Sequence, residues 1–490
     1  MSANKGEVTH PYQLNTWIDV SKPINKHQFL KDSRFGSGGY RNGKYLIPHK
    51  RESVSDYDLR RSKSFYANQY RPIWSAHFKP IFKGDTTRII DSSTPQVYKD
   101  LYNVFLDNAD GKGSTLQSFM EQGAGDTKNL GASFLVMNNN MDIDTTIEEV
   151  LETRDGVPYS FIITPDMVHS YTQDSFGNLS SLKWYQQDGS KTFNSLGEMT
   201  DLGIGITTQN LNKFQYEDYI VVGVDANNWV TYESDGITPI EVVPNEIGVI
   251  PVVRLVEEET NDIIPEPSLY SVARMQHRIF NHDSIITDVS DNQGFSIFTM
   301  PSSGGAIEYS ATKGISYPSD SNNKPEFISP DAQQLKTLLE LGQSYIHNIY
   351  QAGVVNHLQR FQQSAESKEI DRARLNDLLG SYKSQIESAE NQLMRIFGLY
   401  VGFDYGYSVH YSDDYGVSTL SELILNYVEV SNVGIESSIK LMLEKSIASS
   451  MLDFSSEEEK QDFLDSLDVN KELDSMQMEI DNQLIEEDEI

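Results

Sequence analysis

The acidic side chains between Met141 and Glu149 come closest, by type and spacing, to a catalytic or metal-binding pattern. Asp142 and Asp144 alternate along the chain, and Glu148 and Glu149 follow them. Carboxylates in this order could hold a divalent cation, but a calcium-binding loop also needs a third ligand, a central glycine and a terminal glutamate at set offsets, which are missing. We therefore interpret them as a solvated turn before a helix, whose N-terminal dipole favours acidic residues.

Other patterns typical of enzymes are missing from the sequence. Residues 36–39 (GSGG) lack the lysine and the preceding strand of a phosphate-binding loop, and are predicted to be flexible. The chain has no cysteine, which excludes thiol nucleophiles, disulfides and cysteine metal sites. His347 and His357 lie ten residues apart, so they cannot share one helical face as i, i+4 ligands. The sequence thus predicts no catalytic residue, no cofactor and no metal site.

The polar segment that follows Gly353 stands out between two strongly helical patterns. It holds one arginine and no acidic residue, although the whole chain has a net charge of −33. Amide and cationic groups of this kind contact phosphate backbones, so the segment could touch a nucleic acid transiently. A plain connection between two helices is the alternative. The candidate DNA-contacting residues are Asn356, His357, Gln359, Arg360, Gln362 and Gln363.

The net charge is unevenly distributed along the 490 residues. Residues 1–90 carry 16 Lys and Arg against 7 Asp and Glu, whereas residues 451–490 carry 2 against 15. Affinity for DNA comes mainly from cationic contacts. A chain as acidic as this one is therefore not expected to bind DNA over a broad surface. It could instead surround DNA without holding it, because like charge repels the duplex. The alternative is that the charge only maintains solubility.

Composition and length restrict the class of protein further. The 26 Tyr and 21 Phe argue against disorder over most of the chain, and 490 residues suit one very large or two to three ordinary domains. We expect no secretory signal, because the N-terminus has no apolar stretch. We also expect no membrane span, because no run of about 18 apolar residues occurs.

The first half of the chain reads as an arm followed by mixed helices and strands. Residues 1–50 are polar and contain glycine, lysine and asparagine, so they predict an extended or loosely ordered arm. Residues 96–123 have a helical period. Between 158 and 255, short β-branched and aromatic runs alternate with Gly, Asn and Asp, which predicts a β meander.

The second half is predicted to be mainly helical. Apolar residues recur at helical spacing near 269–289 and 331–350, and residues 294–329 between them predict short strands and turns. The strongest helical period runs from Ala365 to Val401. At ~1.5 Å per residue such a helix would be about 55 Å long. A helix of this length usually serves shape rather than catalysis.

The order of these parts resembles the portal proteins of tailed bacteriophages from about Asp56 onward. Ala365 stands where the family usually has a glycine at the start of the long helix. Each matching segment is weak alone, and their order carries the resemblance. The segments are 131–136 (GASFLV), 161–168 (FIITPDMV), 178–184 (NLSSLKW), 248–254 (GVIPVVR), 281–284 (NHDS) and 364–369 (SAESKE).

The resemblance implies an α+β fold of portal type, with an α/β wing, a two-helix stem carrying a small α/β clip insert, a long wing helix and a helical crown. The ranges that it implies are an N-terminal arm at 1–55, the wing at 56–262, the first stem helix at 263–293, the clip at 294–329, the second stem helix at 330–352, the tunnel loop at 353–364, the long wing helix at 365–402, and the crown with an acidic C-terminal tail at 403–490.

The function implied by the resemblance is a ring-shaped channel at one capsid vertex for packaging and ejecting double-stranded DNA. The expected partners are further copies of the chain in a ring of twelve, the terminase large subunit, the major capsid and scaffold proteins, the head-completion adaptor or tail, and the passing DNA, with no membrane. The protein would assemble in the host cytoplasm and reside in the virion. The candidate partner-docking residues of the clip are Met300, Ser302, Ser303, Gly304, Gly305 and Tyr317.

Two other classes remain open at the sequence level. One is a virion structural or scaffold protein that forms no channel. The other is a metal-dependent nucleic-acid enzyme, which the abundance of carboxylates allows but no motif supports.

Overall fold

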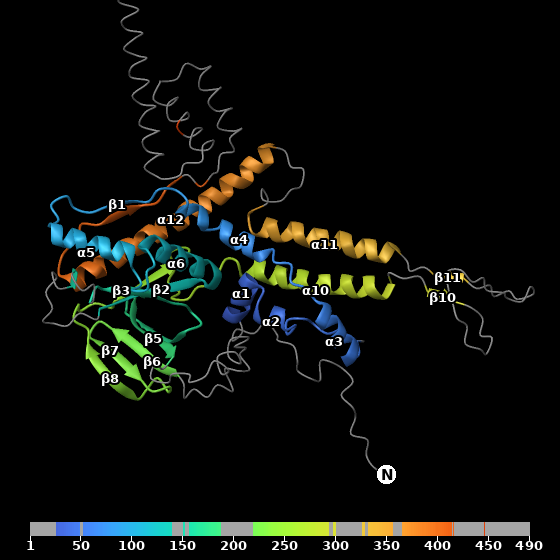
Figure 1. Ribbon diagram of the computed structural model, residues 1–490, viewed down its shortest axis with the longest axis horizontal. Helices are drawn as coiled ribbons and strands as arrows, with labels where there is room; N and C mark the ends of the chain where they lie inside the picture. The colour runs from blue at the N-terminus through green and yellow to red at the C-terminus, as the bar shows by residue number, and fades with distance from the viewer. Residues whose placement is uncertain are drawn as a thin grey trace, which may run out of the picture. The chain divides into compact units, whose positions relative to one another are not determined.

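The computed structural model describes residues 26–49, 52–139, 150–151, 156–187, 219–293, 297–299, 326–328, 332–355, 365–413, 415 and 445 (Figure 1). The chain divides into two compact units, residues 1–415 and 416–490. Apart from Lys445, the residues described here belong to the first unit. Most of the predicted crown therefore lies outside the described part.

The N-terminal segment contains two helices, α1 (Lys26–Phe35) and α2 (Gly38–Arg41). Phe29 and Tyr45 are almost completely buried, and their rings lie 5.6 Å apart at 85°. The buried Asp32 carboxylate accepts hydrogen bonds from the Gly39 amide and the Tyr45 hydroxyl. The prediction of an extended arm is therefore wrong for residues 26–49, because their aromatic side chains find partners far away in the sequence.

Four short helices and a 3₁₀ turn follow. The region predicted as one helix at 96–123 is two helices, because glycines with positive φ, Gly111 and Gly113, bend the chain between them. The elements are α3 (Val54–Lys63), α4 (Tyr70–Ala76), η3 (Lys79–Phe82), α5 (Gln96–Asp107) and α6 (Leu116–Leu130). Gly131, with a φ of 94°, ends α6 and turns the chain into the first sheet.

The first sheet has β2 (Ala132–Asn138) at its centre, between β3 (Tyr159–Ile163) and β9 (Val252–Val256). Both neighbours pair with β2 antiparallel. Residues 132–137 of β2 are buried, as expected for a strand with helices over one face and a second sheet near the other.

The second sheet has five strands in sequence order, so the predicted β meander is confirmed for the strands between residues 168 and 244. Each strand pairs antiparallel with the next. At the two ends of the predicted range, β3 and β9 pair with β2 in the first sheet instead. Trp184 and Leu182 of this sheet share a small core with Phe134 and Val136 of β2. The strands are β4 (Val168–Gln173), β5 (Leu179–Gln187), β6 (Tyr219–Asp225), β7 (Asn228–Tyr232) and β8 (Pro239–Pro244).

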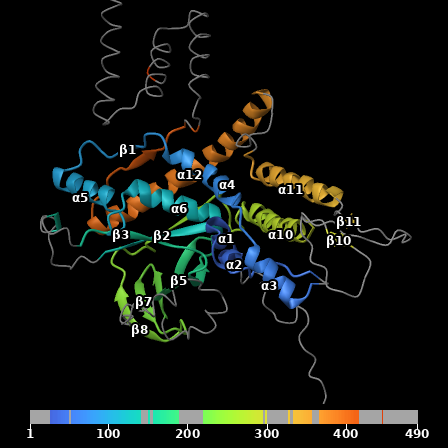
Figure 2. The same ribbon diagram turned by 45° about the vertical axis from the view of Figure 1, so that its right-hand side comes forward.

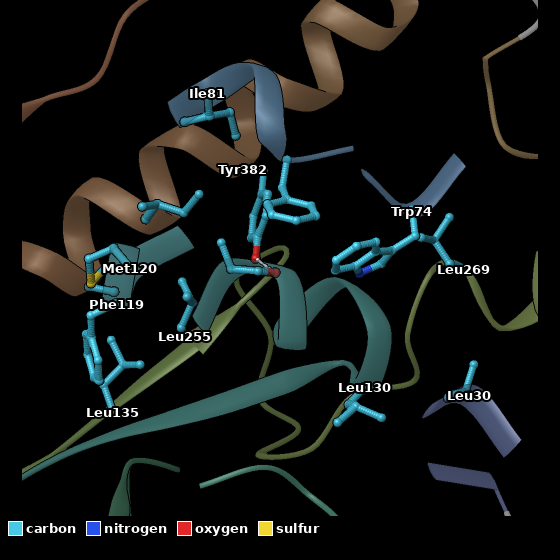
Figure 3. Close-up of a cluster of buried hydrophobic side chains, with 14 of the residues drawn as sticks. Leu30, Trp74, Ile81, Phe119, Met120, Leu130, Leu135, Leu255, Leu269 and Tyr382 are labelled. Carbon is cyan, nitrogen blue, oxygen red and sulfur yellow. Dashed lines mark hydrogen bonds between the residues drawn. The ribbon is translucent and has the colours of Figure 1, made fainter. Parts of the chain in front are cut away.

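The last long helix, α12 (Ala365–Val401), has the bounds that its apolar period predicted. Its second half packs on α6 and on β2, and Figure 3 shows Tyr382 reaching from α12 toward α6. There the Tyr382 hydroxyl donates to the Ala124 carbonyl at 2.7 Å. After α12, β12 (Ser408–His410) returns to pair with β1 (Thr87–Ile89) near the start of the chain. The fold is thus a mixed α+β arrangement.

Candidate functional site at the helical hairpin

Two helices, α10 (Tyr270–Gln293) and α11 (Ala332–Ala352), lie side by side in both views (Figures 1 and 2). His282 Nε2 donates to the Leu338 carbonyl at 2.8 Å, and Arg278 Nη2 donates to the Tyr345 hydroxyl at 2.8 Å. The later residue of α10 contacts the earlier residue of α11, so the two helices run antiparallel. Their bounds lie within the predicted stem ranges 263–293 and 330–352.

The opposite face of α10 packs on the N-terminal helices. Phe280 lies 5.1 Å from the Tyr40 ring, between ring centroids, whereas His282 contacts α11. Residues two apart on a helix differ by about 200° in direction, so these two side chains leave opposite faces. Ser284 continues the Phe280 face and accepts a hydrogen bond from Arg60 Nη1 at 3.0 Å. Helix α10 is therefore held on both sides.

At one end of the hairpin, two short strands pair antiparallel. They are β10 (Ile297–Thr299) and β11 (Glu326–Ile328). They belong to the range predicted as the clip. The candidate docking residues Met300, Ser302, Ser303, Gly304, Gly305 and Tyr317 lie outside the described residues, so their role stays a prediction.

At the other end, helix α11 stops in a capping motif. The Val355 amide donates to the Tyr350 carbonyl at 3.0 Å, and the Val354 amide donates to the Gln351 carbonyl at 3.1 Å. This pair of bonds is the Schellman motif, which places its left-handed residue at the position of Val354. Val354 indeed has a φ of 53°, and it is followed by the fully buried Val355.

The cap rests on the segment around α4. His77 Nε2 lies 2.7 Å from the Gly353 carbonyl oxygen, and since a carbonyl only accepts, the ring donates. The Tyr350 hydroxyl donates to Gln69 Oε1 at 2.9 Å. Any side chain at Gly353 would place its Cβ 2.5 Å from Ile73 Cγ2. The end of α11 is therefore fixed closely against α4.

His77 is buried and neutral in this position. The pKa of its imidazole is lowered to about 4, mainly by burial and also by the nearby Lys128 ammonium, although the hydrogen bond to the Gly353 carbonyl acts in the opposite direction. A neutral ring carries one N–H, and the contact with the Gly353 carbonyl places it on Nε2. The side chain therefore acts here as a hydrogen-bond donor rather than as an acid or base.

The predicted DNA-contacting residues Asn356, His357, Gln359, Arg360, Gln362 and Gln363 lie outside the described residues. The structure therefore describes where their segment begins, at Val355, and where α12 begins, at Ala365, and nothing between. Sequence reasoning missed His77, Ile73 and Val354 at this site. Only Gly353 gave a signal, because glycine after a helical pattern predicts a cap.

Helix α12 is anchored to the β1–β12 strand pair by a buried carboxylate. Glu390, whose side chain is 0% exposed, accepts from Arg88 Nε at 2.7 Å and from the Tyr407 hydroxyl at 2.5 Å. The Tyr411 hydroxyl donates to the other carboxylate oxygen. Arg88 lies on β1, and the two tyrosines flank β12, so the network ties the β1–β12 ribbon to α12.

None of the helices in the described part of the chain has the length and apolar character that a membrane span requires. Within the same ranges, no group of three or more His, Asp or Glu side chains is arranged to hold a metal ion. The acidic residues of 141–149 fall outside these ranges.

Comparisons with known proteins give only distant similarity. No family model matches the chain, and no curated protein matches it. Among solved structures, the chain is similar to a protein of the neck of an empty gene transfer agent particle computed with sixfold symmetry, at 10% identity and a TM-score of 0.40, covering 78% of this chain and 94% of that one. It is also similar to a protein of the virion of a native gene transfer agent particle, at 10% identity and a TM-score of 0.39, covering 78% of this chain and 95% of that one. Similarity at this level carries no functional assignment.

Proposed function

We propose that this chain is a ring-forming structural protein of portal type, through which double-stranded DNA passes at a capsid vertex. The observation that carries the proposal is the helical hairpin. Helices α10 and α11 run antiparallel, the strand pair β10–β11 lies in the insert that joins them, and the chain after α11 leads into the 37-residue α12. This order of parts supports the proposal, because it resembles the order in portal proteins.

The charge of the chain fits passage of DNA without tight binding. Twelve copies of a chain of net charge −33 would carry roughly −400, which repels the phosphate backbone. The segment 353–364 has no acidic residue. In this proposal it lies nearest the DNA, as the tunnel loop, and Arg360 supplies its cationic contact.

The remaining parts take the roles that the resemblance implies. Residues 294–329 would dock the terminase large subunit during packaging and the head-completion adaptor or tail afterwards. The wing would contact neighbouring copies and the capsid and scaffold proteins, and residues 403–490 would form the crown. The chain has no catalytic role in this proposal, since the motor supplies the energy for packaging.

The test is a deletion of residues 356–364, which keeps the buried Val355 and the cap before it. We expect rings to assemble as in the wild type, because the anchors of α11 and α12 remain. We expect DNA packaging or retention to fall. A replacement of 356–364 by glycine and serine of equal length is the matched control for chain connection, and it should share the defect because it lacks Arg360. Normal packaging by both variants would contradict the assignment of this segment.

A further inference from the structure

The cap at the end of α11 contains an unfavourable backbone conformation. Within the described ranges, Val354 is the residue other than glycine with a positive φ, at 53°. β-Branched residues rarely adopt this left-handed region, because their side chains crowd the backbone. Schellman caps usually place glycine there. A strained residue of this kind persists only where its surroundings determine it, and such residues cluster at functional sites.

The glycine of this cap, Gly353, lies one residue before the left-handed position, so it does not relieve the strain at Val354. Gly353 has no room for a side chain, because its Cβ would lie 2.5 Å from Ile73 Cγ2 and 3.3 Å from the Ile349 carbonyl oxygen. Its role is the close approach of α11 to α4, and the left-handed turn falls on Val354.

Three contacts hold this turn in place. His77 donates to the Gly353 carbonyl, Ile73 packs against Gly353, and Val355 is fully buried directly after the turn. His77 and Ile73 are themselves buried, with exposed fractions of 5% and 0%. Contacts on both sides of Val354 thus fix the conformation that the residue alone would avoid.

We propose that His77 is the positioning residue of the cap that ends α11, from which the chain continues toward α12. Together with Ile73 it holds the strained Val354 turn, and so it sets the point and the direction in which the chain leaves α11. Without this contact, we expect Val354 to leave the left-handed region and the cap at the end of α11 to loosen. The positioning role itself concerns this chain alone, whereas its consequence for DNA rests on the proposed function.

The chain has no cysteine, so a single Ala352→Cys substitution, at the exposed last residue of α11, gives one site for a nitroxide label. Continuous-wave electron paramagnetic resonance of the full-length protein, without DNA, then reports the motion of the end of α11. We expect His77→Phe, which removes the donor but keeps an aromatic ring, to make the label more mobile. His77→Gln, which keeps a donor, should restore the slower motion.

The matched control is His277→Phe. His277 Nε2 also donates to a carbonyl, that of Tyr45, at 2.8 Å, but on the face of α10 that packs on the N-terminal segment. This variant loses the same kind of hydrogen bond and should leave the label unchanged. An equal increase in mobility in both phenylalanine variants would overturn the proposal, because the effect would then reflect general loosening.

Two further variants test the strain. Val354→Gly should restore slow label motion in the His77→Phe background, because glycine adopts the left-handed turn without the contact. If His77→Phe does not fold, Gly353→Ala tests the same contact from the other side, by pushing the cap away from Ile73. Label motion in Gly353→Ala that equals the wild type contradicts the proposal.

The experiments distinguish a failure of the positioning role of His77 from a failure of the proposed function. If His77→Phe mobilises the label but DNA is packaged and retained normally, the positioning role stands and the DNA-proximal role of the segment is wrong. If the label is unaffected by His77→Phe and by Gly353→Ala, the positioning role is wrong, whatever the packaging result.

Discussion

Replacing Arg88 by methionine should destabilise the folded chain by about 3–5 kcal/mol, because it leaves the Glu390 carboxylate buried without its cation. The carboxylate is 0% exposed, and the Arg88 side chain is 15% exposed. The tyrosine hydroxyls of 407 and 411 would remain as donors, but they carry no charge. Arg88 Nη2 also donates to Gln117 at 2.9 Å, so the substitution removes a further bond.

The double variant Arg88→Met/Glu390→Leu separates the charge from the packing. A buried ion pair replaced as a whole by apolar groups is often neutral in stability, whereas a broken pair is not. We therefore expect the double variant to lose less than Arg88→Met alone. The stability that the double variant still loses should be about 1 kcal/mol for each tyrosine hydroxyl left without its acceptor.

The assay is urea unfolding followed by circular dichroism, at one fixed protomer concentration because association raises apparent stability. Lys63→Met is the matched control. Lys63 pairs with Asp291 at 2.7 Å, but the two side chains are 38% and 47% exposed, so its loss should stay below about 1 kcal/mol. The reasoning is refuted if Arg88→Met loses no more than Lys63→Met, or if the double variant loses more than Arg88→Met.

Three further predictions concern single residues. The pKa of His77 is lowered to about 4 in the folded chain, from about 6.5 in the unfolded chain. Neutral His77 therefore adds to the free energy of unfolding above pH 6.5, and this stabilisation is lost as the pH falls toward about 4. In acid titrations, the wild type should lose up to about 3 kcal/mol more stability than His77→Gln. Val354→Gly should be more stable than Val354→Ala by about 1 kcal/mol. Inside α10 the order should reverse, and Val289→Ala should be more stable than Val289→Gly by about 1 kcal/mol. Chemical unfolding of the four variants measures both differences. Gly131→Ala places a Cβ 2.2 Å from the Pro265 carbonyl oxygen and should lower the free energy of unfolding by more than about 1 kcal/mol. Gly177 has a similar φ, but a Cβ there would meet nothing within 4 Å, so Gly177→Ala should lose less stability in the same assay.

The sequence predicted best where a local period runs without interruption. The bounds of α12 follow from its apolar stripe, and helices α10 and α11 follow from similar periods. The β meander was also predictable, because short β-branched runs alternate with turn residues. These signals are local, so they need no knowledge of what packs against them.

The sequence failed where contacts between distant residues decide the structure. Residues 26–49 are polar overall, but Phe29, Tyr40 and Tyr45 make them part of the core through contacts with one another and with α10. Glu390 could not be distinguished from the many other carboxylates, because its partners lie about three hundred residues away at Arg88 and beyond the end of α12. The left-handed Val354 carries no sequence signal, since valine is the wrong residue type for that conformation.

The candidate DNA-contacting and docking residues remain predictions. They fall in segments 356–364 and 300–317, outside the described residues. The structure describes the elements on either side of each segment, and it shows that the first begins from a fixed cap. The experiments on residues 356–364 and on His77 therefore address the segment and its anchor in turn.

Electron microscopy of the purified full-length protein tests the central claim most directly. We expect closed rings of cyclic symmetry, built from heterologous contacts between identical copies, with a central opening wide enough for a DNA duplex. Filaments, monomers, or particles whose centre is too narrow for a duplex would contradict the account.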